Sequence, residues 1–137
     1  MRAEIRVAAM LVFAARVAVA AGEEKFAGTW EASAKGTVFL VLRVQSGEKI
    51  SGTMNAGNIS MNDDGDLLEV GPVEDHESPI FFAKVEGNKL VFDFQDEDSE
   101  VLHFELTLTG EGAGELRIVD KDHPKLKGFA VKRVRAA

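Results

Sequence analysis

The chain has 137 residues, contains no cysteine and carries a formal net charge of −7 at pH 7. This length suits a single domain with its own hydrophobic core. The lack of cysteine excludes disulfides, thiolate catalysis and cysteine-ligated metal sites. Because an acidic surface repels phosphate backbones, we expect no nucleic-acid partner.

Residues 1–20 have the order of a secretory signal. Two arginines precede an apolar stretch, which ends in small residues up to Ala20. We therefore expect a helical signal peptide over 1–20, cleaved after Ala20 or Ala21, and one domain over 21–137. A third arginine interrupts the apolar stretch, so an amphipathic helix that stays attached is the alternative. The stretch is too short and too interrupted to form a stable membrane span.

A leader of this kind predicts a secreted or periplasmic protein. Small domains exported by animal cells are usually cross-linked by disulfides. A cysteine-free domain therefore fits a bacterial envelope better, and its stability has to come from an apolar core.

The chain after the leader has the pattern of short strands. Alternating or short apolar runs are separated by clusters of Gly, Asn, Asp and Ser. The segment 58–62 is left open as a further short strand. We predict strands at 26–34, 37–45, 49–55, 67–74, 79–86, 89–95, 100–109, 113–120 and 128–134.

The turns between these strands predict how the strands are arranged. Three short Gly-containing turns, centred on Gly47, Gly87 and residues 110–112, each join two strands directly. Such turns make antiparallel hairpins and leave no room for the crossovers of parallel sheets. We predict an all-β fold, an antiparallel meander of eight or nine strands closed into a barrel, because closure removes exposed edges. A two-sheet sandwich is the alternative. The run 38–44 is apolar on both faces until Arg43, which predicts cover on both sides.

One motif resembles a known family. Gly28-Thr29-Trp30, at the start of the first long strand, resembles the Gly-x-Trp signature of the calycin group, which includes lipocalins and avidin-like proteins. In lipocalins the tryptophan closes the barrel floor, and an arginine of the last strand packs across it. The resemblance implies a calycin-like barrel with Arg133 over Trp30, Arg135 being a second candidate. The chain has one tryptophan and no tyrosine, so no biotin-binding residue carries over from the avidin-like proteins.

The inward rows of the predicted barrel are rich in leucine and phenylalanine. An eight-stranded barrel is just wide enough to be filled by side chains or to hold one small ligand. The first alternative is therefore a filled core, and the second is a carrier of a small apolar ligand. The candidate ligand-binding residues are Leu42, Phe92, Phe94, Phe104 and Leu106.

A barrel with a filled core would act through its outer surface, as an envelope module that binds another protein. Phe39, Val41 and Val91 lie opposite the main core rows. We expect them to form an exposed apolar patch that suits such a role.

Metal and catalytic motifs are weak. Asn62 to Asp66 (NDDGD) has the oxygen-bearing side chains of a calcium loop without its register, and an Asp-Gly turn explains it more simply. His76, His103 and His123 have no metal-binding spacing, and we expect His103 on the surface. No GxSxG motif or phosphate-binding loop occurs. We therefore expect a non-catalytic protein without metal or cofactor, and a hydrolase is the less favoured alternative.

Overall fold

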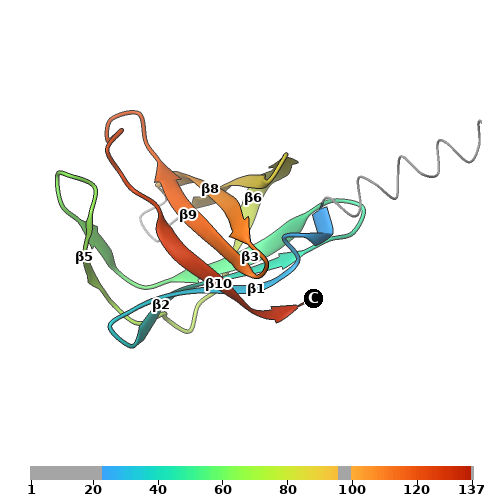
Figure 1. The fold of residues 1–137 in the computed structure, drawn as a ribbon, viewed down its shortest axis with the longest axis horizontal. Coiled ribbons are helices and arrows are strands. Elements are labelled where there is room, and N and C mark those ends of the chain that lie inside the picture. Colours follow the sequence, from blue (N-terminus) through green and yellow to red (C-terminus); the bar gives the residue numbers. More distant parts are fainter. Residues whose placement is uncertain (1–22, 96–99, 137) are drawn as a thin grey trace, which may run out of the picture.

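The computed structural model describes residues 23–95 and 100–136 (Figure 1). The predicted strand positions agree with the observed ones within a few residues. The signal peptide predicted over 1–20 lies outside the described residues. The strands are β1 (Gly28–Ala34), β2 (Thr37–Gln45), β3 (Ser51–Ala56), β4 (Ile59–Met61), β5 (Leu67–Val70), β6 (Ser78–Glu86), β7 (Lys89–Gln95), β8 (Val101–Gly110), β9 (Ala113–Val119) and β10 (Phe129–Ala136).

Eight of these strands close into one barrel in the order β1-β10-β9-β8-β7-β6-β3-β2, with antiparallel pairing throughout (Figure 1). The predicted all-β meander is confirmed, and the closed ring excludes the sandwich. The architecture is compatible with a calycin-like barrel. β4 and β5 form a separate hairpin outside the ring. The open segment 58–62 thus holds a strand, whereas the strand predicted at 67–74 is shorter and is not part of the barrel.

The two ends of the barrel differ, and we name them by what they carry. The floor is the end that holds Trp30, where β1 begins. The mouth is the opposite end, from which the β4–β5 hairpin extends at the left of Figure 1. Trp30 is fully buried, and the hairpin rests its partly buried apolar side chains against the core: Ile59, Met61, Leu67 and Val70.

The chain leaves the barrel between β3 and β6, and this weakens the ladder between those strands. Only two residue pairs join them, Thr53↔Pro79 and Met54↔Ser78. Proline has no N–H to donate to a ladder. No tight turn connects β3 to β6, so no hairpin geometry sets their register.

Residues 71–77, which lead from β5 to β6, cross the outer face of β2 and β3. The backbone N–H of Val73 donates to the carbonyl of Val38 (3.2 Å). The side-chain amide of Asn55 donates to the carbonyl of Glu74. This crossing buries Val41, which is 7% exposed. The predicted cover on both faces of β2 is therefore confirmed.

The predicted exposed patch of Phe39, Val41 and Val91 is wrong. Val41 lies under the crossing segment, and Phe39 is 1% exposed. The β1–β2 ladder shifts register between Ala32 and Ser33, so Phe39 is an extra, unpaired residue of β2. A bulge of this kind re-aims side chains. The ring of Phe39 accordingly lies in the core, 5.2 Å from the ring of Phe129 between centroids.

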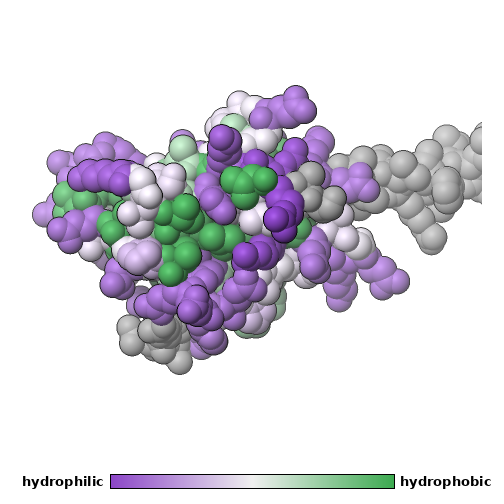
Figure 2. Space-filling model, turned by 90° about the horizontal axis from the view of Figure 1, so that it is seen from below, coloured by the Kyte–Doolittle hydropathy of each residue, from purple (hydrophilic) through white to green (hydrophobic). Residues whose placement is uncertain are grey.

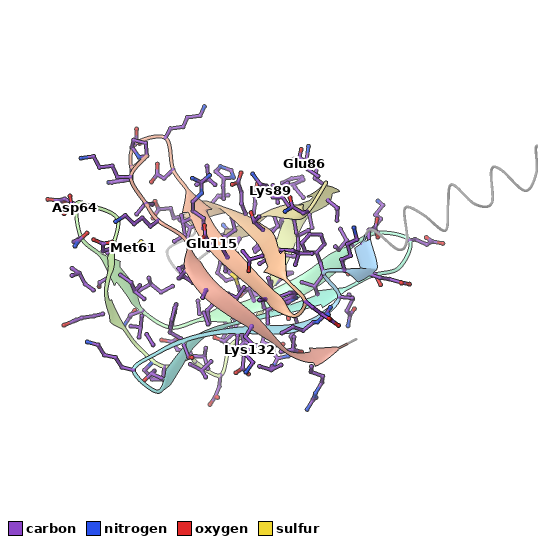
Figure 3. The ribbon with its side chains drawn as sticks, viewed as in Figure 1. Met61, Asp64, Glu86, Lys89, Glu115 and Lys132 are labelled. Atoms are coloured by element: carbon purple, nitrogen blue, oxygen red, sulfur yellow. The ribbon has the colours of Figure 1, made fainter. Side chains whose placement is uncertain are left out.

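The tip of the β4–β5 hairpin docks on the loop between β9 and β10. The N–H of Lys127 donates to the carbonyl of Gly65 (3.2 Å), and its ammonium group pairs with Asp66 (2.7 Å). Gly65 has a positive φ of 83° and would clash with the backbone of Lys125 if it carried a Cβ. Figure 3 shows Met61 and Asp64 on this hairpin, at the mouth. The hairpin and the loop therefore support each other there.

The outside of the barrel is mostly hydrophilic, with local apolar areas. Figure 2 shows a broad hydrophobic area near the middle of the face seen from below, with smaller ones beside it and hydrophilic side chains around them. Across β7, β8 and β9, Glu105 forms ion pairs with Lys89 (3.4 Å) and Arg117 (2.9 Å). Within the described part of the chain, the exposed large apolar side chains are Leu68, Phe81, Phe82, Val101 and Val134.

Candidate functional site

A cavity of about 360 Å³ lies at the mouth, beside the short β3–β6 ladder. Its apolar wall comes from inward-facing side chains of four barrel strands. The ladders place Phe94 opposite Leu102, and Phe104 opposite Ile118. Met54 of β3 extends this wall, and Ala56 of β3 and Ile59 of the β4–β5 hairpin also line the cavity. Because side chains on one face of neighbouring strands lie side by side, the alternation in the sequence creates the wall directly.

The rim of this cavity is polar. Asn58 follows β3, and Glu74 and His76 belong to the segment that crosses the outside of the barrel. All three side chains are exposed. The cavity therefore combines an apolar interior with a few hydrogen-bonding groups at its opening, as small-molecule sites usually do.

The structure divides the predicted ligand-binding residues into two groups. Phe94 and Phe104 line the cavity, with ring centroids 6.4 Å apart in an edge-to-face arrangement. Leu42, Phe92 and Leu106 do not line it and are at most 2% exposed. They belong to the packed core. The barrel is thus filled around these three residues and open at its mouth.

Several cavity residues were not predicted as site residues. Met54 and Ile118 lie on strands whose alternation marks them as inward-facing, and this signal could have found them. Leu102 alternates with Phe104 and Leu106 on one face of β8, and this signal could have found it too. Nothing in the sequence pattern placed Glu74 or His76 at the same opening, because they reach it through the crossing segment.

The floor is closed by Trp30. Its indole N–H donates to the carbonyl of Phe26 (2.9 Å), which belongs to a turn just before β1. That turn is held by the N–H of Phe26, which donates to the carbonyl of Glu23 (3.0 Å). Trp30 and Phe26 are both 0% exposed. A buried indole N–H needs such an acceptor, and the turn supplies it.

Arg133 lies over the face of Trp30. Its guanidinium carbon is 5.5 Å from the centre of the ring, within the range of a cation–π interaction. The same group donates to the carbonyls of Lys25 (3.3 Å) and Ala27 (3.4 Å). The contact expected between Arg133 and Trp30 is present, and Arg135 is exposed instead. Arg133 of the last strand thus connects to Trp30 of the first strand, and to the backbone just before that strand, at the floor.

Asn62 and Asp66 of the NDDGD segment are engaged within the protein. The side-chain carbonyl of Asn62 accepts from the backbone N–H groups of Asp64 (3.0 Å) and Asp66 (2.9 Å). The hydrogen bond and charge of Lys127 lower the pKa of Asp66 below its ordinary value. This arrangement is that of an Asx-stabilised hairpin turn docked on a lysine.

The three histidines lie in different settings. His76 lines the mouth cavity, whereas His103 and His123 lie outside the barrel, beside Asp93 (2.5 Å) and Asp120 (3.0 Å). The hydrogen bond and charge of Asp120 raise the pKa of His123. Among residues 23–95 and 100–136, no group of three or more His, Asp or Glu side chains is arranged to hold a metal ion.

Comparison of the chain with protein-family models, with curated proteins and with solved structures finds no match. No helix within the described residues is long and apolar enough to cross a membrane.

Proposed function

We propose that this protein is an exported, non-catalytic barrel of the calycin type that binds a small apolar ligand at the mouth. The cavity lined by Phe94, Phe104, Leu102 and Ile118 is the observation that carries the proposal. Its volume lies near the lower end of the roughly 300–1,000 Å³ typical of small-molecule sites. The ligand is therefore a compact apolar molecule rather than a long lipid chain.

The calycin assignment rests on the floor as well as on the barrel. The Gly-Thr-Trp motif begins β1, its tryptophan closes the floor, and an arginine of the last strand covers it. The signal pattern over 1–20 supports export. If the leader is removed, N-terminal sequencing of the protein recovered from the cell envelope or the medium will begin at Ala21 or Gly22. A start at Met1 would contradict export by this route.

Binding can be measured with N-phenyl-1-naphthylamine, a neutral apolar dye whose fluorescence rises in a dry site. Trp30 is a poor reporter because it lies at the floor and does not line the cavity. We expect saturable binding of the dye and displacement by compact apolar competitors. No saturable signal with the folded protein would refute the proposal.

A matched pair of variants assigns the signal to the mouth. Leu102 lines the cavity, and its neighbour Val101 is 53% exposed on the opposite face of β8. Leu102→Arg places a charge at the apolar wall and should weaken dye binding at least about tenfold. Val101→Arg should leave binding unchanged. Equal binding by both variants, with matching melting temperatures, would place the dye elsewhere.

A further inference from the structure

Phe82 is the most exposed large apolar residue among those described, with 85% of its surface accessible. It lies in β6, where the β6–β7 ladder shifts register between Phe81 and Lys84. Its φ angle is +53°, a conformation that bulky residues rarely adopt. The surrounding structure thus maintains a strained backbone that presents an aromatic ring to solvent. Such strain concentrates at functional sites.

A groove of about 690 Å³ lies beside this ring, on the floor side of the short β3–β6 ladder. Ile50, Ala83 and Val85 supply its apolar part together with Phe82 itself. Beyond Pro79, the described part of β6 has no ladder partner on the side of β3. The same face therefore carries a projecting ring, an apolar hollow and an open strand edge.

The charges around the groove are balanced, unlike those of the chain. Glu23 and Glu48 face it together with Lys49 and Lys84, whereas the whole chain has 23 acidic and 16 basic residues. Two copies of an acidic protein repel each other over most of their surfaces. This patch lacks that net repulsion. When two copies are related by a two-fold axis, the acidic residues of the patch on one copy can face the basic residues of the same patch on the other.

We propose that this face binds a second copy of the chain, with Phe82 of each copy seated in the groove of the other. A two-fold interface brings one patch against itself, so it requires a projection and a hollow on the same surface. Phe82 and the groove meet that requirement. An aromatic ring that enters an apolar pocket is also the usual kind of anchor in protein interfaces. The inference is independent of the mouth cavity and of any ligand bound there.

Sedimentation velocity over a wide concentration range tests this proposal on the protein expressed with its own leader and purified as the cell delivers it. We expect a reversible monomer–dimer equilibrium. Phe82→Glu should raise the dimer Kd at least about tenfold. Leu68→Glu is the matched control, because Leu68 is 54% exposed on β5, away from this face. A monomer at every concentration, or equal weakening by both variants, would overturn the proposal.

Two further variants separate the interface from folding and from general charge. Phe82→Asn removes the ring but suits a positive φ, so it should abolish the dimer without lowering the melting temperature of the monomer. Lys84→Glu should weaken the dimer, and Glu48→Lys in the same chain should restore it. A dimer that persists in Phe82→Asn, or a dimer Kd that neither charge substitution changes, would also overturn the proposal.

Discussion

Two seams of the barrel join neighbouring strands that do not follow each other directly in the chain, β1–β10 and β3–β6, and they are closed in different ways. The β1–β10 seam has four residue pairs, and Trp30 and Arg133 add side-chain contacts across and below it. The β3–β6 seam has two residue pairs, with the mouth cavity on one side and the groove beside Phe82 on the other. The first seam is packed, and the second leaves surfaces open.

A small barrel can keep accessible surface at a seam whose strands are not joined by a hairpin. A hairpin turn sets the register of most neighbouring strands here. No such turn joins β1 to β10, where the two ends of the chain meet, or β3 to β6, where the chain leaves the ring. A buried aromatic residue compensates at the first of these places. The second keeps less pairing and more accessible apolar surface. The proposed ligand site and the proposed dimer face therefore both lie at the second seam, whereas the first seam contributes to stability.

Hydrogen exchange should show the largest difference between the seams. Amides of the β1–β10 ladder should exchange only through global unfolding, which costs about 5–15 kcal/mol in domains of this kind. Amides within Ile80–Val85 that point away from β7 should exchange almost as fast as in an unfolded chain. NMR or mass spectrometry can resolve the two sets. Equal protection in both would contradict the comparison.

Trp30→Ala should cause the largest loss of stability among the substitutions considered. It removes a fully buried ring and leaves a cavity at the floor, at a cost of ~3–5 kcal/mol. Urea denaturation followed by circular dichroism measures the loss. Val134→Ala is the control, because Val134 is 49% exposed on β10 and should change stability by under about 0.5 kcal/mol. Similar midpoints for both variants would show that Trp30 does not hold the seam.

Arg133→Met should have an intermediate effect. The substitution keeps an apolar side chain over the indole but loses the cation and its two bonds to backbone carbonyls. We expect a loss of about 1–2 kcal/mol. Arg133→Lys should recover part of it, and Arg135→Met should have little effect because Arg135 is exposed. If Arg135→Met lowered the free energy of unfolding more than Arg133→Met, Arg135 and not Arg133 would be the arginine that supports the floor.

Glu105→Gln should have a smaller effect than Trp30→Ala or Arg133→Met, because the ion pairs of Glu105 lie across β7, β8 and β9 and not at either seam. Partial burial disfavours the charged carboxylate, but hydrogen bonds from Arg117 and Lys89 outweigh this and lower the pKa of Glu105 below its ordinary value of 4.5. The loss should be about 0.5–1 kcal/mol near neutral pH.

The effect of Glu105→Gln should also depend on pH. A carboxylate with a lowered pKa stabilises the fold above its unfolded pKa, and this stabilisation disappears as the pH falls through the folded pKa. The gap between wild-type and variant urea midpoints should therefore shrink in acid. A gap that widens in acid would contradict the assigned direction.

The strand order and the floor could be predicted because they depend on local patterns. Alternation in runs such as Leu90–Phe94 marks inward faces, and the Gly turns mark hairpins. The pairing of Arg133 with Trp30 was implied by the resemblance of Gly28-Thr29-Trp30 to the calycin signature. In contrast, Phe39 was assigned to the wrong face, because a bulge changes the parity of a strand and leaves no mark in the apolar pattern.

The candidate site could be predicted only in part for a similar reason. Phe94 and Phe104 share a face with Phe92, and the sequence does not distinguish a cavity wall from a filled core when all members of a row are apolar. Whether each of these phenylalanines lines the cavity depends on its distance from the mouth and on the path of residues 71–77 there. The position of Glu74 and His76 depends on residues 71–77, whose path no period or turn signal encodes.

The amino-acid sequence by itself determined an all-β meander with an apolar interior, a tryptophan at its first long strand and an arginine on its last. These features rest on alternation, turn chemistry and one short motif, all of which act between near neighbours. Only the tertiary structure decided that β4 and β5 lie outside the ring, that β3 and β6 barely pair, and that Phe82 projects beside a groove. Those outcomes depend on competition between distant segments for the same faces and edges, and no local pattern records which segment prevails.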